Sequence, residues 1–178
     1  MGYTLGEDLA ARNPGDSEGK KVGIISGYKD TCCAGERTRG VLDALADTDY
    51  EIQFTINVTY ETSITEMFMQ QKPVDYLIVL ETGILEEIAK ILSDKQENGM
   101  KVYGIGSSIK CVYYLDEAVI DGLIVVDGYD MGYQSGLQIS DMLNKRLHRT
   151  KDQATDYRLL HKEDIFSEDT QKFLYTFY

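Results

Sequence analysis

Polar, charged and aromatic side chains follow the apolar segments of this sequence, at the places where short strands are expected to end. Arg37 and Tyr60 come after the first two segments, and Glu81 follows the third directly. Ser107 and Asp127 come after the next two. Hydroxyls, carboxylates, a guanidinium and aromatic rings together suit the binding of a polyol or another small polar molecule. The candidate ligand-binding residues are Arg37, Tyr60, Glu81, Thr82, Ser107 and Asp127.

Each candidate also has an ordinary structural explanation. Thr82 and Ser107 lie near the starts of expected helices, where a hydroxyl side chain commonly caps the backbone. Arg37 is of a type that is common on surfaces, and Tyr60 could pack at the rim of any loop. Glu81 is the hardest to explain in this way, because a carboxylate at the mouth of a buried central strand more often has a function.

Motifs for catalysis, metals and cofactors are weak or absent. The sequence has no GxxxxGK[ST] phosphate loop and no GxSxG nucleophile motif, and Gly104–Gly106 lacks the third glycine of a dinucleotide site. Cys32 and Cys33 have no histidine nearby in sequence, which disfavours a thiol enzyme. His148 and His161 do not show the ligand spacing of a zinc site. We therefore predict no catalytic residue, no metal and no cofactor.

Composition and charge restrict the class of protein further. The formal net charge is −12 and the pI about 4.5, which argues against binding to nucleic acid because phosphates require clustered lysine and arginine. The longest apolar runs, such as Tyr76–Leu80, are far shorter than the roughly 20 residues of a membrane-spanning helix. The first residues carry Glu7 and Asp8 and no apolar segment, so the chain as given shows no signal peptide.

Apolar segments and helical periodicity alternate along the chain. Strands are expected near residues 21–26, 51–57, 75–80, 101–105, 123–126 and 156–160. Helices are expected at about 36–46, from Ser63 onwards, at 85–92, at 112–119 and at 131–147. This alternation predicts a single α/β domain over residues 1–178, a doubly wound and mostly parallel sheet of about five to six strands with helices on both faces. In such sheets ligands bind at the carboxyl ends of the strands, where the candidate residues lie.

The order of these segments resembles the type 1 periplasmic binding protein family, which includes ribose- and galactose-binding proteins and the sensory part of lactose-repressor-like regulators. The resemblance rests on KKVGIISG followed by GERTRGVLDAL, on VYGIGSS, and on VIDGLIVVDGYDMGYQSGLQISDML. The helix from Gly2 to Ala10 is similar to the one that opens the family's second lobe, and DYRLLHKEDIFSEDT is similar to its terminal segment. The chain is thus similar to the C-terminal lobe of a two-lobed protein.

The resemblance implies ligand contacts at Arg37, Tyr60, Glu81, Gly106 and Asp127. Sugar-binding members usually carry asparagine or aspartate near the position of Glu81 and an aspartate near that of Gly106, and this second carboxylate is absent here. The departure leaves room for a modified sugar or an amine-bearing ligand. In the family, the helix that matches residues 131–147 packs on the missing first lobe, so here it must repack, be exposed or bind a second copy.

By resemblance the chain is the solute-binding lobe of an extracytoplasmic protein, in the periplasm or as a cell-surface lipoprotein, that serves an ABC transporter and has no catalytic activity. Its implied partners are a small sugar-like solute, the missing N-terminal lobe and a membrane permease. The alternative is the effector lobe of a LacI-like transcription regulator or sensor. A small flavodoxin-like enzyme with a bound cofactor and a fragment without activity also remain open. For the isolated lobe we expect a homodimer.

Overall fold

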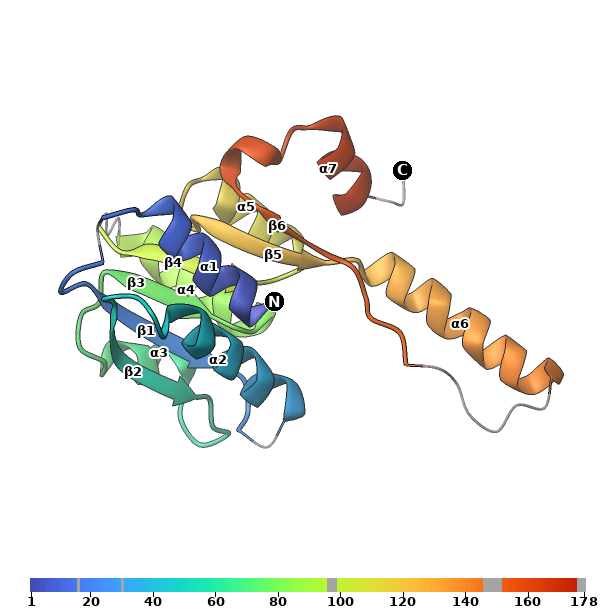
Figure 1. Ribbon diagram of the computed structural model, residues 1–178, viewed down its shortest axis with the longest axis horizontal. Helices are drawn as coiled ribbons and strands as arrows, with labels where there is room; N and C mark the ends of the chain where they lie inside the picture. Colours follow the sequence, from blue (N-terminus) through green and yellow to red (C-terminus); the bar gives the residue numbers. More distant parts are fainter. Residues whose placement is uncertain (16, 30, 96–98, 146–151, 176–178) are drawn as a thin grey trace.

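The computed structural model describes residues 1–15, 17–29, 31–95, 99–145 and 152–175. Its sheet has six strands in the order β2-β1-β3-β4-β5-β6, with helices on both faces (Figure 1). The strands are β1 (Lys21–Ser26), β2 (Glu51–Asn57), β3 (Tyr76–Val79), β4 (Lys101–Ile105), β5 (Gly122–Val126) and β6 (Tyr157–Leu160). These bounds agree with the predicted ranges to within one residue at either end.

Helices connect the strands and extend beyond the last one. They are α1 (Gly2–Arg12), α2 (Cys32–Leu45), α3 (Ile64–Met69), α4 (Thr82–Lys95), α5 (Ile109–Asp116), α6 (Gly128–Lys145), the short 3₁₀ helix η1 (Lys162–Asp164) and α7 (Glu168–Leu174). No helix among the described residues is long and apolar enough to cross a membrane.

Strands β1 to β5 pair in parallel, whereas β6 pairs antiparallel with β5. The chain leaves the carboxyl end of β5, runs out along α6 and returns to the same edge of the sheet (Figure 1). The next strand must therefore run in the opposite direction, which places Leu160 beside Leu123. The predicted mostly parallel α/β sheet is confirmed.

Two apolar cores lie on the two faces of the sheet. In β3, Tyr76 and Ile78 belong to the core beneath α1 and α2, while Leu77 and Val79 belong to the core beneath α3, α4 and α5. A strand that is buried on both faces needs apolar residues at successive positions. The uninterrupted apolar runs of the sequence reflect this double burial.

Helices α1 and α2 approach each other closely through glycines. A Cβ atom on Gly2 would lie 1.9 Å from the carbonyl oxygen of Arg37, and one on Gly40 would lie 2.7 Å from the backbone nitrogen of Tyr3. Because no side chain separates the backbones at these points, α1 fixes the position of α2. This packing also determines where Arg37 projects from α2.

Two helix predictions differ from the structure. Helix α2 begins at Cys32 instead of Glu36, because its first turn adds only the small buried side chain of Ala34 to the apolar face, which is a weak signal in the sequence. Helix α5 ends at Asp116, and Ala118 beyond it adopts a positive φ of 56° and is exposed. The predicted continuation of this helix to residue 119 is therefore wrong.

Helix α6 stands away from the rest of the domain (Figure 1). Tyr133, Leu137 and Leu143 on this helix are 54%, 46% and 77% exposed. Of the outcomes considered for this helix, exposure is the one found in the isolated chain. Residues 146 and 147, which the prediction included in the helix, lie outside the described residues.

Candidate functional site

All six candidate residues lie in loops or helix starts that follow strands β1 to β5. Because these strands are parallel neighbours, their carboxyl ends share one edge of the sheet. Along this edge the strand order places Tyr60 after β2, Arg37 in the helix that follows β1, and Glu81 after β3. Ser107 after β4 and Asp127 after β5 continue the row.

A cavity of about 230 Å³ lies between the loop after β1 and the end of β3, and we call it the Glu81 cavity. It brings Arg37 and Glu81 together, as the topology suggested. Its lining residues are Gly27, Tyr28, Thr31, Cys33, Ala34, Arg37, Leu80 and Glu81. Thr82, the first residue of α4, does not line this cavity.

The guanidinium of Arg37 is partly committed to the fold. Its Nη1 donates a hydrogen bond of 2.8 Å to the backbone carbonyl of Leu80, at the end of β3. Its Nε is buried without a hydrogen-bond partner. Arg37 therefore ties the start of α2 to the end of β3, and a ligand could use only the donors that this contact leaves free.

The carboxylate of Glu81 is half-buried at the mouth of β3. Within the part of the chain that the structure describes, it has no hydrogen-bond or ion-pair partner. The backbone carbonyl of Glu81 accepts the first hydrogen bond of α4, from the N–H of Leu85 at 3.0 Å. The backbone at this position is thus fixed by the helix start, while the carboxylate is available to the cavity.

An aromatic pair extends the wall of the Glu81 cavity. The rings of Tyr28 and Tyr60 stack with centroids 4.1 Å apart and planes 14° apart. Tyr28 lines the cavity, whereas Tyr60 is 87% exposed and is not one of the lining residues. The side-chain amide of Asn57 donates to the carbonyl of Gly27 at 2.8 Å, which holds the two loops together.

Tyr28 lines the cavity but was not among the predicted ligand-binding residues, and Cys33, which was considered only as a possible thiol nucleophile, lines it as well. Tyr28 directly follows the glycine after the first strand, and Tyr60 occupies a similar place after the second. An aromatic residue after each of two neighbouring strands is the sequence pattern that could have predicted this stacked pair.

Ser107 and Asp127 line a different cavity, of about 340 Å³, between the ends of β4 and β5 and helix α7. Both side chains already have partners in the backbone. Ser107 Oγ accepts a hydrogen bond from the N–H of Val126 at 3.1 Å, and Asp127 Oδ1 accepts one from the N–H of Asp130 at 2.8 Å. The structure thus places Arg37 and Glu81 at one cavity and Ser107 and Asp127 at another, whereas Tyr60 and Thr82 line neither of the two.

The hydroxyl that caps α5 is that of Ser108, whereas the Ser107 side chain bonds to the end of β5 instead. Ser108 Oγ accepts a hydrogen bond from the N–H of Cys111 at 3.2 Å, at the start of α5. A hydrogen bond from the Ser108 side chain also lowers the pKa of Glu86, which pairs with Lys110 at 3.1 Å. This carboxylate is therefore satisfied within the protein.

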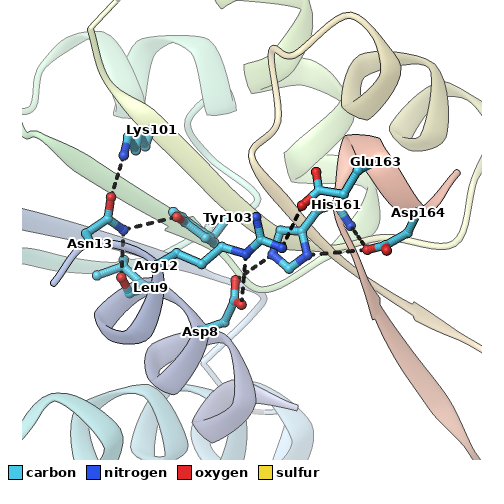
Figure 2. Close-up of polar contacts among 9 residues, drawn as sticks. All are labelled: Asp8, Leu9, Arg12, Asn13, Lys101, Tyr103, His161, Glu163 and Asp164. Carbon is cyan, nitrogen blue, oxygen red and sulfur yellow. Dashed lines mark hydrogen bonds and ion pairs between the residues drawn. The ribbon is translucent and has the colours of Figure 1, made fainter.

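A second polar cluster ties the terminal segment to α1 and lies away from the carboxyl edge (Figure 2). His161 Nε2 lies 2.9 Å from the Asp8 carboxylate, and Arg12 donates to Glu163 at 2.8 Å. Asn13 donates to the Tyr103 hydroxyl at 3.3 Å, and burial raises the pKa of that phenol to about 12. These groups satisfy one another, so we assign the cluster to stability.

No group of three or more histidine, cysteine, aspartate or glutamate side chains that could hold a metal occurs among the described residues. The donors at the carboxyl edge are instead suited to hydrogen bonds with a small polar molecule.

A protein-family model described as a periplasmic binding protein domain matches residues 1–147. No curated protein matches the chain by sequence. Among solved structures, a carbohydrate-transporter solute-binding protein from Agrobacterium radiobacter, in complex with D-arabinose, is 18% identical with a TM-score of 0.82. The match covers 97% of this chain and 62% of that protein.

Further solved structures give a similar picture. An ABC-transporter solute-binding protein from Burkholderia graminis, also with D-arabinose, has 16% identity and a TM-score of 0.79, over 93% of this chain and 60% of that one. A putative LacI transcriptional regulator from Bacteroides fragilis has 16% identity and a TM-score of 0.72, over 92% of this chain and 61% of that one. The chain therefore spans less than two thirds of the length of each of these proteins, and the likeness at this identity concerns the fold.

Proposed function

The chain belongs to the periplasmic binding protein domain family, and from this membership we propose that it is the C-terminal, solute-binding lobe of a sugar-binding protein that serves an ABC transporter. The single observation that carries the proposal is the Glu81 cavity at the carboxyl edge. It places a free carboxylate, a guanidinium and a tyrosine ring around a space of about 230 Å³. These are the groups that recognise the hydroxyls and the ring face of a sugar.

In the proposed mechanism, the ligand's hydroxyls donate to Glu81 and accept from the free donors of Arg37. The face of the sugar ring packs against Tyr28, which is held in place by its stack with Tyr60. Ser107 and Asp127 contribute at the second cavity along the same edge. Capture requires no bond to be made or broken, so the proposal assigns no catalytic step to these residues.

The remaining parts of the proposal concern the whole protein. A first lobe would close over the carboxyl edge by a hinge motion, and a membrane permease would receive the solute. Such a protein works outside the cytoplasm, in the periplasm or attached to the cell surface. These assignments follow from the family and from the solved solute-binding neighbours, of which this chain spans about 60%.

The second candidate is the effector-binding lobe of a transcription regulator. It is favoured by the structural likeness to the putative LacI regulator, which is comparable to that of the solute-binding proteins. The two candidates share the ligand site and differ in what precedes the lobe. A lipoprotein or secretion signal upstream in the gene supports the transporter role, and a helix-turn-helix segment supports the regulator.

A nuclear magnetic resonance titration of the chain with D-arabinose, D-ribose and D-galactose tests the ligand site. We expect amide shifts at Gly27, Tyr28 and Glu81, saturating at millimolar sugar. Arg37→Ala should weaken binding by about 1.5–3 kcal/mol, the range for hydrogen bonds to charged groups, which removes the response. A response confined to other parts of the domain would contradict the proposal.

Arg39→Ala is the matched control. It removes a guanidinium from the same helix, and Arg39 is exposed and pairs with Glu36 one turn away. We expect this variant to bind as the wild type does. An overlay of the two variants' spectra without ligand shows whether Arg37→Ala has altered the fold through loss of the Leu80 contact.

A further inference from the structure

Three acceptor side chains along the carboxyl edge are already occupied by the protein itself. Asp127 accepts from the N–H of Asp130, and Ser107 accepts from the N–H of Val126. Ser108 accepts from the N–H of Cys111. Glu81 differs from all of these, since its carboxylate has no partner within the described part of the chain. A ligand in the Glu81 cavity therefore meets a carboxylate whose acceptor atoms are unused by the described part of the protein.

Arg37 is the cation that lines the same cavity, and it offsets the charge of Glu81 across the cavity without direct contact. No ion pair within 4.0 Å joins it to Glu81 among the described residues. Its Nη1 is held by the Leu80 carbonyl and its Nε is buried. Lys29, in the loop after β1, is exposed and does not line the cavity.

A carboxylate offers only acceptors, so it selects for ligand groups that donate. A sugar hydroxyl donates one hydrogen, whereas a protonated amine donates several and carries the opposite charge. Charge-assisted hydrogen bonds are roughly twice as strong as neutral ones. The net charge of −12 further raises the local concentration of cations and lowers that of anions such as sugar phosphates.

We propose that the Glu81 cavity prefers an amine-bearing sugar to the neutral sugar of the same shape, with the Glu81 carboxylate paired to the ligand's ammonium group. This proposal rests on the proposed function and specifies its substrate class.

Matched ligand pairs test the preference: D-glucosamine against D-glucose, and D-galactosamine against D-galactose. The chain is titrated with each, by nuclear magnetic resonance, at a pH below the pKa of the sugar amine. We expect at least one amino sugar to bind about ten-fold more tightly than its neutral partner, at the lower end of the range for charged hydrogen bonds. N-acetyl-D-glucosamine keeps the nitrogen without the charge and should lose the advantage.

Two variants separate a specific contact from general electrostatic attraction. Glu81→Gln keeps the size of the side chain and should bring the affinity ratio close to one. Glu117→Gln removes the same charge from an exposed position next to the end of α5 and should leave the ratio unchanged.

The outcomes are distinct. Equal or tighter binding of the neutral sugars overturns the amine preference and leaves the sugar-binding function intact. An amine preference that survives in Glu81→Gln overturns the assignment to Glu81. If no sugar binds at all, the proposed function fails, and the substrate class that rests on it fails as well.

Discussion

Asp75 and Asp121 occupy equivalent positions, each just before a strand at the amino edge of the sheet. Asp75 accepts a hydrogen bond from the backbone N–H of Lys21 at 2.9 Å, and Asp121 accepts one from the N–H of Val102 at 2.8 Å. Their pKa values nevertheless shift in opposite directions. The hydrogen bond from Lys21, helped by Lys20, lowers the pKa of Asp75, whereas burial raises the pKa of Asp121.

The opposite shifts predict opposite effects of the two asparagine substitutions. A lowered folded pKa means that Asp75 stabilises the fold above the unfolded pKa, near 4, and that this stability is lost as the pH falls through the folded pKa. A raised folded pKa means that charged Asp121 costs stability at neutral pH, and that this cost disappears as the pH falls through that folded pKa toward the unfolded one.

We therefore expect Asp75→Asn to be less stable than the wild type at neutral pH and Asp121→Asn to be equally or more stable. Both differences should shrink toward acid pH, where the carboxyl groups become neutral. Urea unfolding of the three proteins across this pH range measures the differences. Stability changes of the same sign in both variants would show that the hydrogen bond, and not the charge, dominates at both positions.

Sequence reasoning located the candidate residues at one edge but could not assign them to cavities. Arg37 contacts the carbonyl of a residue 43 positions away, and Ser107 accepts from a backbone N–H 19 positions away. Neither contact has a local signal in the sequence. The rule that ligands bind at strand carboxyl ends predicts the edge, whereas the loop conformations decide which side chains are free.

The strands of the sheet could be predicted because the central ones are buried on both faces. Their sequences are therefore continuous apolar runs. Helix starts were less predictable. The first turn of α2 contributes only the small side chain of Ala34 to the core, so it adds little to the apolar repeat of the sequence. The glycines that join α1 to α2 also gave no periodic signal, because their contribution is the absence of a side chain.

The contact between α1 and α2 leads to a prediction about Gly40. Gly40→Ala should destabilise the protein by about 1–3 kcal/mol, because the added methyl group would lie 2.7 Å from the backbone nitrogen of Tyr3. Gly35→Ala is the control in the same helix, where a Cβ atom would meet nothing within 4 Å. This variant should gain about 0.5–1 kcal/mol from the lower entropy of the unfolded chain.

Chemical unfolding of both glycine variants gives the two free energies. Equal stability of Gly40→Ala and Gly35→Ala would mean that α1 can move away without cost. Because Arg37 lies one turn before Gly40, a shift of α2 in Gly40→Ala should also reduce the sugar response of the Glu81 cavity.

The packing of the domain does not explain the position of helix α6. An amphipathic helix normally owes its stability to the surface that covers its apolar side. In this chain the helix projects from the domain (Figure 1). Its side chains Tyr133, Leu137 and Leu143 are exposed. An exposed apolar patch of several hundred Å² usually marks a place of association.

If the proposed first lobe completes the ligand site, the isolated chain should bind its ligand only weakly. Tight small-molecule sites bury about 70–90% or more of their ligand, and in the proposed protein the first lobe would supply part of that burial. If half of the contacts are missing, about half of the favourable energy is lost, while most of the cost of immobilising the ligand remains. A ligand bound by the two-lobed protein with micromolar affinity, about −8 kcal/mol, would then bind here at millimolar concentration or more weakly.

We therefore predict that the isolated chain binds sugars weakly and forms a homodimer through α6. Light scattering should show twice the mass of one chain, and titration calorimetry should show no micromolar sugar affinity. Leu143→Glu, combined with Leu137→Glu, should give a monomer because the charges oppose burial of this face. Phe166→Glu is the control, since Phe166 is 73% exposed and lies outside α6, so this variant should remain dimeric. A monodisperse wild-type monomer with micromolar sugar affinity would contradict both parts, because a half-open site would then be sufficient and α6 would need no cover.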